Sequence, residues 1–273
     1  MAVKTLESRM KTYEAVPRLF LTRRVPVIIR IDGKAFHTFT KGFEKPFDNI
    51  VVNAMQNTML KLCEDIQGCV FGYTQSDEIT LVLTDYDTIT TDAWFGYNVQ
   101  KMASVSASMA TSYFNKALAN EILDRISAEM LEKRLDEAQN LAKLLSSKEL
   151  NAMFDSRVFN IPKDEVANCL VWRQQDAIRN SIEAVGQKFI GKKSVMNMSC
   201  AEMVDSLKRN HNIDWNQYPI HLQRGSCSYK KFETIENINR KTGEKLIKTR
   251  GKWVVDKEIP IFSDDREFIE KWI

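Results

Sequence analysis

The sequence lacks the features that mark membrane, secreted and zinc-bound proteins. Its uninterrupted apolar runs are only a few residues long, far short of the roughly 20 residues that cross a bilayer. The start of the chain is too charged for a secretory signal. Its five cysteines are scattered and form no C-x-x-C pair, so neither a disulfide framework nor a zinc ribbon is indicated. We therefore expect a cytosolic protein with reduced, structural cysteines and no membrane partner.

Several common catalytic signatures are also missing. The chain has no nucleophile elbow G-x-S-x-G, no phosphate-binding loop G-x-x-x-x-G-K-[ST] and no zinc motif H-E-x-x-H. The sequence therefore gives no motif that would support a hydrolase, a Walker-type ATPase or a zinc protease. Only three histidines are present, and His37 has no Ser or Asp partner at a recognisable spacing. For His37 we favour a structural or nucleotide-packing role over acid–base catalysis.

What the chain does have is a globular composition and an uneven charge. Its 273 residues are 44% hydrophobic and 27% charged, enough for one large or two modest domains. The formal net charge of +3 is small, but from Arg224 to Lys257 ten basic residues face four acidic ones, a local net charge of +6. Because Tyr229, Phe232 and Trp253 lie in the same stretch, it suits a phosphate-backbone contact surface as well as it suits a solvated hairpin.

Two short segments join a β-type apolar run to acidic residues. In residues 27–34 the run ends in Asp32 and Gly33, and in residues 73–82 Asp77 and Glu78 stand where a hairpin would turn. If these strands pair, the carboxylates meet at one end of a sheet, as in a divalent-metal site made of oxygen ligands. The alternative is that these aspartates only cap helices or form turns.

The order of predicted elements favours an α+β fold with a ferredoxin-like sheet. Residues 25–161 read as strand, helix, strand, strand, helix, insertion and strand, which is a split βαβ antiparallel sheet with helices on one face. We expect Asp48 to cap the first of these helices and Thr91 or Asp92 to cap the second, which ends near residue 118. We expect the first strand to lie centrally, beside the second and third.

The remaining segments are predicted to elaborate this sheet. We divide the chain into a catalytic domain, 1–162, with a helical insertion near 120–150, and a region 163–273 that packs on it as one unit. The further predictions are a short amphipathic helix over 3–16, a helix over 164–186, a helix opened by the capping box of Ser199 and Glu202, a β-hairpin over 229–255 that turns near 242–243, and a last helix over 264–272 capped by Ser263.

The acidic segments suggest a particular chemistry. Asp32, Asp77 and the carbonyl of Gly33 are oxygen donors that suit two Mg²⁺ ions, whose coordination a nucleoside triphosphate would complete. Two such metals serve both ends of a phosphoryl displacement. We expect the backbone N–H groups of the segment Gly33, Lys34, Ala35, Phe36 and His37 to cradle the triphosphate, and Lys45, Lys101 and Arg30 to act as phosphate clamps. By spacing alone, Arg173 and Asp176 read as a surface ion pair.

Four ordered motifs carry a resemblance to a known family. They are RIDGKAFH at 30–37, KPFD at 45–48, YTQSDE at 73–78 and WRQQD at 172–176. In this order they resemble the tRNA-histidine guanylyltransferase family and its relatives, the 3′-to-5′ tRNA polymerases, over about residues 1–231. The resemblance implies a palm domain like that of ordinary polymerases. It also implies that ATP or GTP activates the tRNA 5′ end, which the 3′-hydroxyl of an incoming nucleotide then attacks.

The resemblance also implies roles for individual residues. Asp32, Asp77 and the Gly33 carbonyl would bind the two Mg²⁺ ions, with Glu78 and Ser76 beside them. Lys45 and Ser76 would assist 5′ activation. Triphosphate or tRNA would be handled by Arg30, Lys101, Arg173 and Asp176, and we add as tRNA contacts Arg179, Lys245, Lys248, Arg250 and Lys252. Family members usually assemble as tetramers, which implies a homotetramer here.

One departure from the family pattern concerns substrate choice. Members dedicated to histidine tRNA typically carry His-Ile-Asn-Asn soon after the Trp-Arg-Gln motif, whereas this chain has Ala-Ile-Arg-Asn at 177–180. We therefore expect template-dependent repair of 5′-truncated tRNAs, and strict guanylylation of histidine tRNA is the alternative. Two alternatives of other classes are a palm-fold nucleotide cyclase and a non-enzymatic tRNA-binding module whose acids are only structural.

Overall fold

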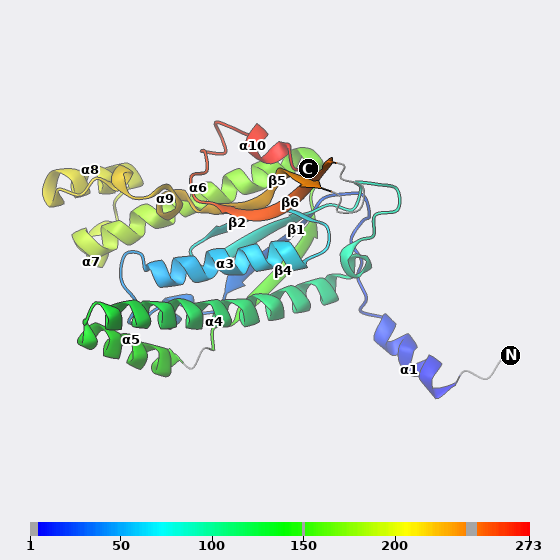
Figure 1. Cartoon of the computed structure of the whole chain (residues 1–273), viewed down its shortest axis with the longest axis horizontal. Helices are drawn as coiled ribbons and strands as arrows, with labels where there is room; N and C mark the ends of the chain where they lie inside the picture. Colours follow the sequence, from blue (N-terminus) through cyan, green and yellow to red (C-terminus); the bar gives the residue numbers. More distant parts are fainter. Residues whose placement is uncertain (1–4, 149–150, 239–244) are drawn as a thin grey trace.

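A six-stranded antiparallel sheet forms the centre of the computed structural model, which describes residues 5–148, 151–238 and 245–273 (Figure 1). The strands lie in the order β4-β1-β3-β2-β5-β6. Their bounds are β1 Val27–Gly33, β2 Cys69–Gln75, β3 Glu78–Leu83, β4 Phe154–Asn160, β5 Ser226–Ile238 and β6 Lys245–Asp256. The first four strands keep the ferredoxin-like order, which confirms the predicted fold class.

One predicted strand neighbour is wrong. β1 lies between β3 and β4, and β2 pairs with β3 and β5 instead of with β1. The reason is that β2 and β3 form a tight hairpin whose outer β2 edge pairs with β5, so only β3 is left to face β1. The pairing between the two acid-bearing segments is unaffected, because it is β3 that carries Glu78.

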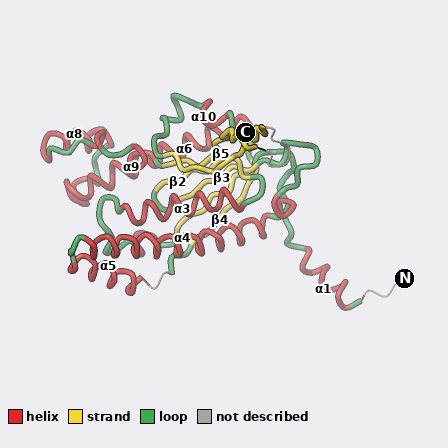
Figure 2. Tube along the Cα trace, in the orientation of Figure 1, coloured by secondary structure: helices red, strands yellow, loops and turns green. Residues whose placement is uncertain are grey.

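Helices cover both faces of the sheet (Figure 2). α3 and α4 cover one face, as a ferredoxin-like fold predicts, and α6 and α10 from the C-terminal region cover the other. The helix bounds are α1 Leu6–Ala15, α2 Phe36–Phe39, α3 Asn49–Asp65, α4 Val99–Leu131, α5 Leu135–Lys148, α6 Val166–Gly186, α7 Lys192–Val195, α8 Cys200–His211, α9 Ile220–Arg224 and α10 Glu267–Glu270.

The predicted caps were right for two helices and wrong for two. Asp48 accepts hydrogen bonds from the first turn of α3, and Ser199 forms a capping box with Glu202 at α8. α4 begins instead at Asn98, because the turn at 94–97 has positive φ at three residues and breaks the helix there. It runs on to Leu131, so the predicted insertion is the end of α4 followed by α5. At α10, Asp265 and not Ser263 accepts the hydrogen bond from Phe268.

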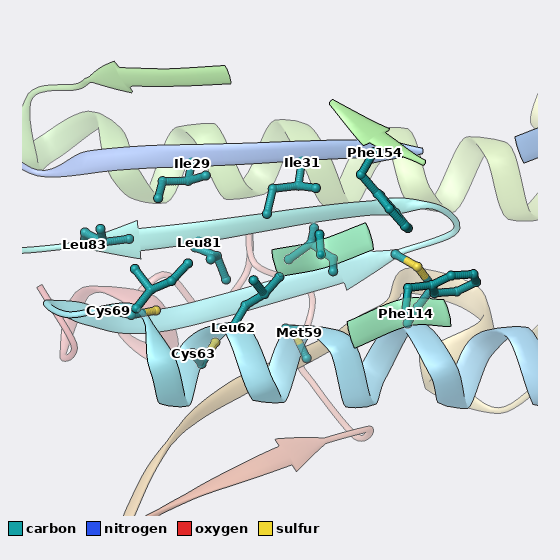
Figure 3. Close-up of a cluster of buried hydrophobic side chains, with 14 of the residues drawn as sticks. Ile29, Ile31, Met59, Leu62, Cys63, Cys69, Leu81, Leu83, Phe114 and Phe154 are labelled. Atoms are coloured by element: carbon teal, nitrogen blue, oxygen red, sulfur yellow. The ribbon is translucent and has the colours of Figure 1, made fainter. Parts of the chain in front are cut away.

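The strand that ends in Asp32 is buried on both faces, as its apolar run predicts. Val27, Ile29 and Ile31 belong to the core under α3 and α4, whereas Ile28 packs toward α6. In Figure 3, Ile29 and Ile31 lie above the α3 side chains of Met59, Leu62 and Cys63. Since side chains alternate along a strand, Arg30 and Asp32 share the α6 face with Ile28.

The predicted N-terminal helix forms, but it buries none of its side chains against the described residues. α1 has no buried residue and projects away from the sheet and its covering helices (Figure 1). Within the described residues, no helix is both long and apolar enough to cross a bilayer. All five cysteines are free, as predicted.

β2 and α3 approach closely at a glycine. A Cβ atom on Gly72 would lie 2.5 Å from the sulfur of Cys63 and 3.1 Å from Cγ of Met59. Both side chains are fully packed into the core, so neither is free to move aside without a cost in packing. The small residue at 72 therefore sets the distance between the sheet and α3.

We expect Gly72→Ala to lower the free energy of unfolding by about 1–3 kcal/mol, because the added methyl overpacks the core. Urea unfolding measures this. Cys63→Ala removes the atom that the new methyl meets, so the double variant should lose less than the sum of the two single variants, by at least about 0.5 kcal/mol. Simple additivity would contradict this account.

Candidate active site

The pairing of β1 with β3 brings the predicted acids to one end of the sheet. Asp32 lies directly opposite Glu78, and the N–H of Gly33 donates to the carbonyl of Asp77 at 3.0 Å. Ser76 and Asp77 form the two-residue turn between β2 and β3. Ser76 has a φ of 49°, which is unusual for a residue with a side chain, and its hydroxyl donates to Oδ1 of Asp77 at 3.0 Å.

Asp77 lies in a partly desolvated place at this end of the sheet. Burial raises its pKa, the hydrogen bonds from the Ser76 hydroxyl and from its own backbone lower it, and the negative charge of Asp32 raises it again. The two carboxylates are thus close enough to repel each other in a partly desolvated place. A cation held between them would relieve this repulsion.

The donor set at this place fits a hard divalent cation. Two carboxylates and a backbone carbonyl at Gly33 are the oxygen ligands that Mg²⁺ prefers, and this ion leaves several positions to water and substrate phosphates. Within the described residues, no group of three or more His, Cys, Asp and Glu side chains is placed to hold a metal. The site would thus be completed by its substrate.

Glu78 belongs to a buried ion network on the α6 side of the sheet. Its Oε2 lies 2.9 Å from Nη1 of Arg173 and 4.0 Å from Nε of Arg30. Burial raises the pKa of Glu78, and the two arginines, Arg173 first, lower it. Glu78 therefore holds two guanidinium groups beside the acids, instead of standing free as a metal ligand.

Arg173 is buried, whereas its spacing to Asp176 predicted an ion pair at the surface. Its role toward triphosphate or tRNA stays a prediction. Its guanidinium carbon lies 3.6 Å from the centroid of the Trp172 ring, and its Nη1 lies 3.5 Å from Asp176. Only 6% of the residue is exposed, because Glu78 and Trp172 enclose the guanidinium. Arg179 is exposed and pairs with the other oxygen of Asp176. Arg179 and Trp172 are the residues of this set that lie at the surface.

A cavity of about 950 Å³, partly open to solvent, lies beside the turn. Five predicted residues line it: Phe36, His37, Lys45, Ser76 and Asp77. Lys45 is exposed and its ammonium donates to the hydroxyl of Thr40 at 3.3 Å. The prediction missed other lining residues, Thr40, Phe43, Phe47, Val52 and Ala184. The motif KPFD pointed to this loop, but nothing in the sequence marks the small Ala184 on a distant helix.

The segment after β1 is shaped by a glycine and an aromatic ring. A Cβ atom on Gly33 would lie 2.3 Å from the ring of Phe36, so this ring can pack only against a glycine. The ring is itself in contact with Phe114 and Phe154, at centroid distances of 5.3 and 5.1 Å. The aromatic cluster thereby pins α2 against the acidic end of β1.

Fewer backbone N–H groups than predicted are available to bind a triphosphate in the segment 33–37. The N–H of Gly33 donates to Asp77, and that of Lys34 donates to the carbonyl of Met153 at 2.8 Å, so neither is available to a ligand. The N–H groups of Ala35, Phe36 and His37 donate no hydrogen bond within the described part of the chain. Ala35 has a left-handed φ of 55°, a geometry typical of backbone nests that bind anions.

Lys101 is not brought to the acids. It lies in the first turn of α4, which follows an isolated bridge between Phe20 and Asn98. Residue 20 precedes β1, so this turn lies at the end of the sheet opposite Asp32. The ammonium of Lys101 lies 5.5 Å from the centroid of the Phe95 ring. Within one chain Lys101 thus lies far from the acids, and its role as a phosphate clamp stays a prediction.

The basic hairpin forms as β5 and β6 and extends the sheet beyond β2. Arg250 and Lys252 are exposed on β6. The side chains of Lys245 and Lys248 lie outside the described residues. None of these strand positions lies at the acidic turn, so the predicted site divides into an acidic centre and a separate basic hairpin.

The chain is similar to known proteins in sequence and in fold. The family model described as tRNAHis guanylyltransferase matches residues 7–162. A probable tRNA(His) guanylyltransferase of Dictyostelium discoideum is 23% identical over 249 residues, which span 86% of each chain.

Solved structures extend the likeness over nearly the whole chain. A bacterial tRNA(His) guanylyltransferase (Thg1)-like protein in complex with ATP is 40% identical, with a TM-score of 0.78 over 98% of this chain and 99% of that one. A structure of the same description in complex with GTP is also 40% identical, with a TM-score of 0.74 over 98% of each chain. This chain therefore belongs to the tRNA(His) guanylyltransferase family, whose members are nucleotidyltransferases that act on tRNA.

Proposed function

We propose that the protein adds nucleotides to the 5′ end of tRNA in the 3′-to-5′ direction, after activation of that end by ATP or GTP. The observation that carries the proposal is the meeting of Asp32 and Asp77 beside a cavity that Ser76, Lys45 and His37 also line. The bacterial relatives solved with ATP and with GTP support both nucleotides as substrates.

In this proposal the acidic residues of the site bind metal ions, and the basic residue and free N–H groups bind phosphate. Asp32, Asp77 and the Gly33 carbonyl would hold two Mg²⁺ ions, which neutralise phosphate charge and stabilise the departing pyrophosphate when bound. Lys45, exposed at the cavity wall, binds phosphate charge, and Ser76 orients the Asp77 carboxylate through its hydroxyl. The free N–H groups of residues 35–37 donate to triphosphate oxygens.

Template-dependent repair is the form of the activity that we favour. The motif of members dedicated to histidine tRNA is replaced at 177–180, where Ala177 is buried and Arg179 is bound to Asp176. The alternative is strict guanylylation of histidine tRNA, which the family description favours. The proposal includes a homotetramer, implied by the resemblance, and a cytosolic location, which the free cysteines support.

The test is nucleotide addition to several 5′-truncated tRNAs whose template base is varied. We expect each tRNA to receive the complementary nucleotide. Asp32→Ala and Asp77→Ala should each slow addition about 1,000-fold or more, since loss of a metal costs several kcal/mol of transition-state stabilisation. Asp205→Ala, an exposed aspartate on α8, is the matched control and should leave the rate unchanged.

Three outcomes would contradict this proposal. A single guanosine added only to histidine tRNA would favour strict guanylylation. A cyclic product formed from ATP or GTP without RNA would favour a cyclase. Normal addition by both aspartate variants, with folds intact by circular dichroism, would remove the two-metal site.

The raised pKa of Asp77 predicts how stability depends on pH. The ionised carboxylate is disfavoured by burial and by Asp32, so in EDTA the stability of the wild type should fall as the pH rises through this raised pKa. Asp77→Asn cannot ionise. It should therefore unfold at a higher temperature than the wild type at neutral pH, and this advantage should vanish in acid. Added Mg²⁺ should raise the melting temperature of the wild type alone, and an equal rise in both proteins would contradict the assignment.

The basic hairpin is suited to an RNA backbone by the placement of its charges. Lys231 on β5 lies directly opposite Lys252 on β6, and like charges in this position repel. Neither lysine pairs with an acid within the described residues. Arg250, two residues from Lys252, is exposed on the same face of the ribbon. A row of phosphates would neutralise this face.

Changing Lys245, Lys248, Arg250 and Lys252 together to alanine should weaken tRNA binding. It should also reduce the slope of log K against log salt, by up to about 0.9 for each phosphate that the hairpin no longer neutralises. Filter binding at several salt concentrations measures both. A control with four dispersed lysines changed, at positions 11, 61, 116 and 208, should keep most of the slope. An unchanged slope in the hairpin variant would show that the hairpin does not contact the backbone.

A further inference from the structure

The hairpin of α4 and α5 packs against the segment of residues 34–48, which follows β1 and carries Lys45. α5 lies along the second half of α4 (Figure 1). Leu144 of α5 is half-buried and packs against the core that lies under the sheet. A Cβ atom on Gly42 would lie 3.3 Å from Cδ1 of Leu144, so α5 and the segment are in direct contact.

Aromatic rings join this segment to the same core. Phe36, Phe39 and Phe43 form a row with centroid distances of 5.2 and 6.3 Å, and they pack in one cluster with the leucines of α5. The hydroxyl of Thr40, within this row, donates to the carbonyl of Phe36 at 2.8 Å and accepts from the ammonium of Lys45 at 3.3 Å. The packing of the rings therefore influences where Lys45 stands at the cavity wall.

A buried carboxylate fixes the turn between the two helices of the hairpin. Glu129, near the end of α4, is only 1% exposed. Its Oε1 lies 2.5 Å from Nε of Arg125, and its Oε2 accepts a hydrogen bond from Nε of Arg134, in the turn before α5. A buried carboxylate is costly unless it is paired. The two arginines therefore hold Glu129 in place, and Glu129 in return fixes the turn that directs α5.

α5 depends on these contacts for its own stability. A helix of 14 residues is marginal on its own in water. Among its described side chains Ala138 alone is buried, so its half-buried leucines and the ion cluster of Glu129, Arg125 and Arg134 keep it on the core. Loss of either contact would loosen the segment that α5 touches.

We propose that the α4–α5 hairpin positions Lys45 for activation of the tRNA 5′ end, with Leu144 and Glu129 as positioning residues. The inference rests on the proposed function, in which Lys45 assists that activation. Neither Leu144 nor Glu129 lines the cavity that Lys45 lines. Leu144 supports the segment by direct contact, and Glu129 acts through α5. Their loss should therefore slow the step that uses Lys45 and spare the step that does not.

The experiment measures the two steps separately under single-turnover conditions. One rate is activation of a 5′-monophosphorylated tRNA by ATP, and the other is nucleotide addition to a tRNA with a preformed 5′-triphosphate, which needs no activation. Leu144→Ala and Glu129→Gln should each slow activation about tenfold, because a misplaced group loses rate steeply, and slow addition less than about twofold. The matched controls are the exposed Leu135→Ala of α5 and Glu132→Gln, an exposed partner of Arg134; both should match the wild type.

A double variant tests whether the effect passes through Lys45. Lys45→Ala should itself slow activation, and adding Leu144→Ala to it should slow activation no further, because residues that act through one group are not additive. Multiplied effects, equal slowing of both steps, or unchanged rates in Leu144→Ala and Glu129→Gln would each overturn the proposal.

Limited digestion with trypsin tests the support of the segment without any activity. Lys41 is exposed within the segment, and cleavage after it requires local opening. This cleavage should be about tenfold faster in Leu144→Ala and Glu129→Gln than in the wild type and in Leu135→Ala, whereas cleavage after Lys61 on α3 should not change. Unchanged cleavage after Lys41, or equal acceleration at both lysines, would overturn the proposal. If the digestion changes as expected but the wild type adds no nucleotide to either tRNA, it is the proposed function that fails.

Discussion

The register between β1 and β3 is the constraint on which the site depends. Asp32 stands opposite Glu78, and the Gly33 N–H reaches the carbonyl of Asp77 beyond the end of the ladder. A slip of one residue would send every side chain of β1 to the other face. Ile29 and Ile31 would then leave the core under α3, so the burial of this apolar strand also holds its terminal aspartate in place.

The turn after β2 divides the neighbourhood into regions of different charge. Glu78 begins β3 and faces α6, where Arg173 and Arg30 surround it. Asp77 faces a cavity lined by Lys45, and Ser76 stands between this cavity and an uncharged one. The positive φ of Ser76 costs energy that the surrounding hairpin must offset, as is common where a turn serves function. The turn thus lies beside carboxylates, guanidinium groups and the wall of the uncharged cavity.

α6 joins the acidic centre to the segment at which we propose that the substrate is chosen. Arg173 fixes Glu78 from its first half, and Ala177 and Asn180 line the uncharged cavity one and two turns later. Residues 177–180 are also where this chain departs from members dedicated to histidine tRNA. Two residues of this segment, Ala177 and Asn180, therefore line the uncharged cavity, where a change need not disturb the carboxylates.

The sequence by itself determined the strands, the caps of α3 and α8 and the pairing of the two acidic segments, because these follow from apolar periodicity, local hydrogen bonding and motif order. It did not show that Arg173 is buried, that Lys101 lies far from the acids within one chain, or that the N–H groups of Gly33 and Lys34 are already hydrogen-bonded. Only the tertiary structure decided these, because they depend on how α4 and α6 lie on the sheet and on which backbone groups other strands already use. The sequence did not predict the two cavities either. Their walls combine residues from α3, α6 and the turn at Ser76, which no local sequence pattern connects.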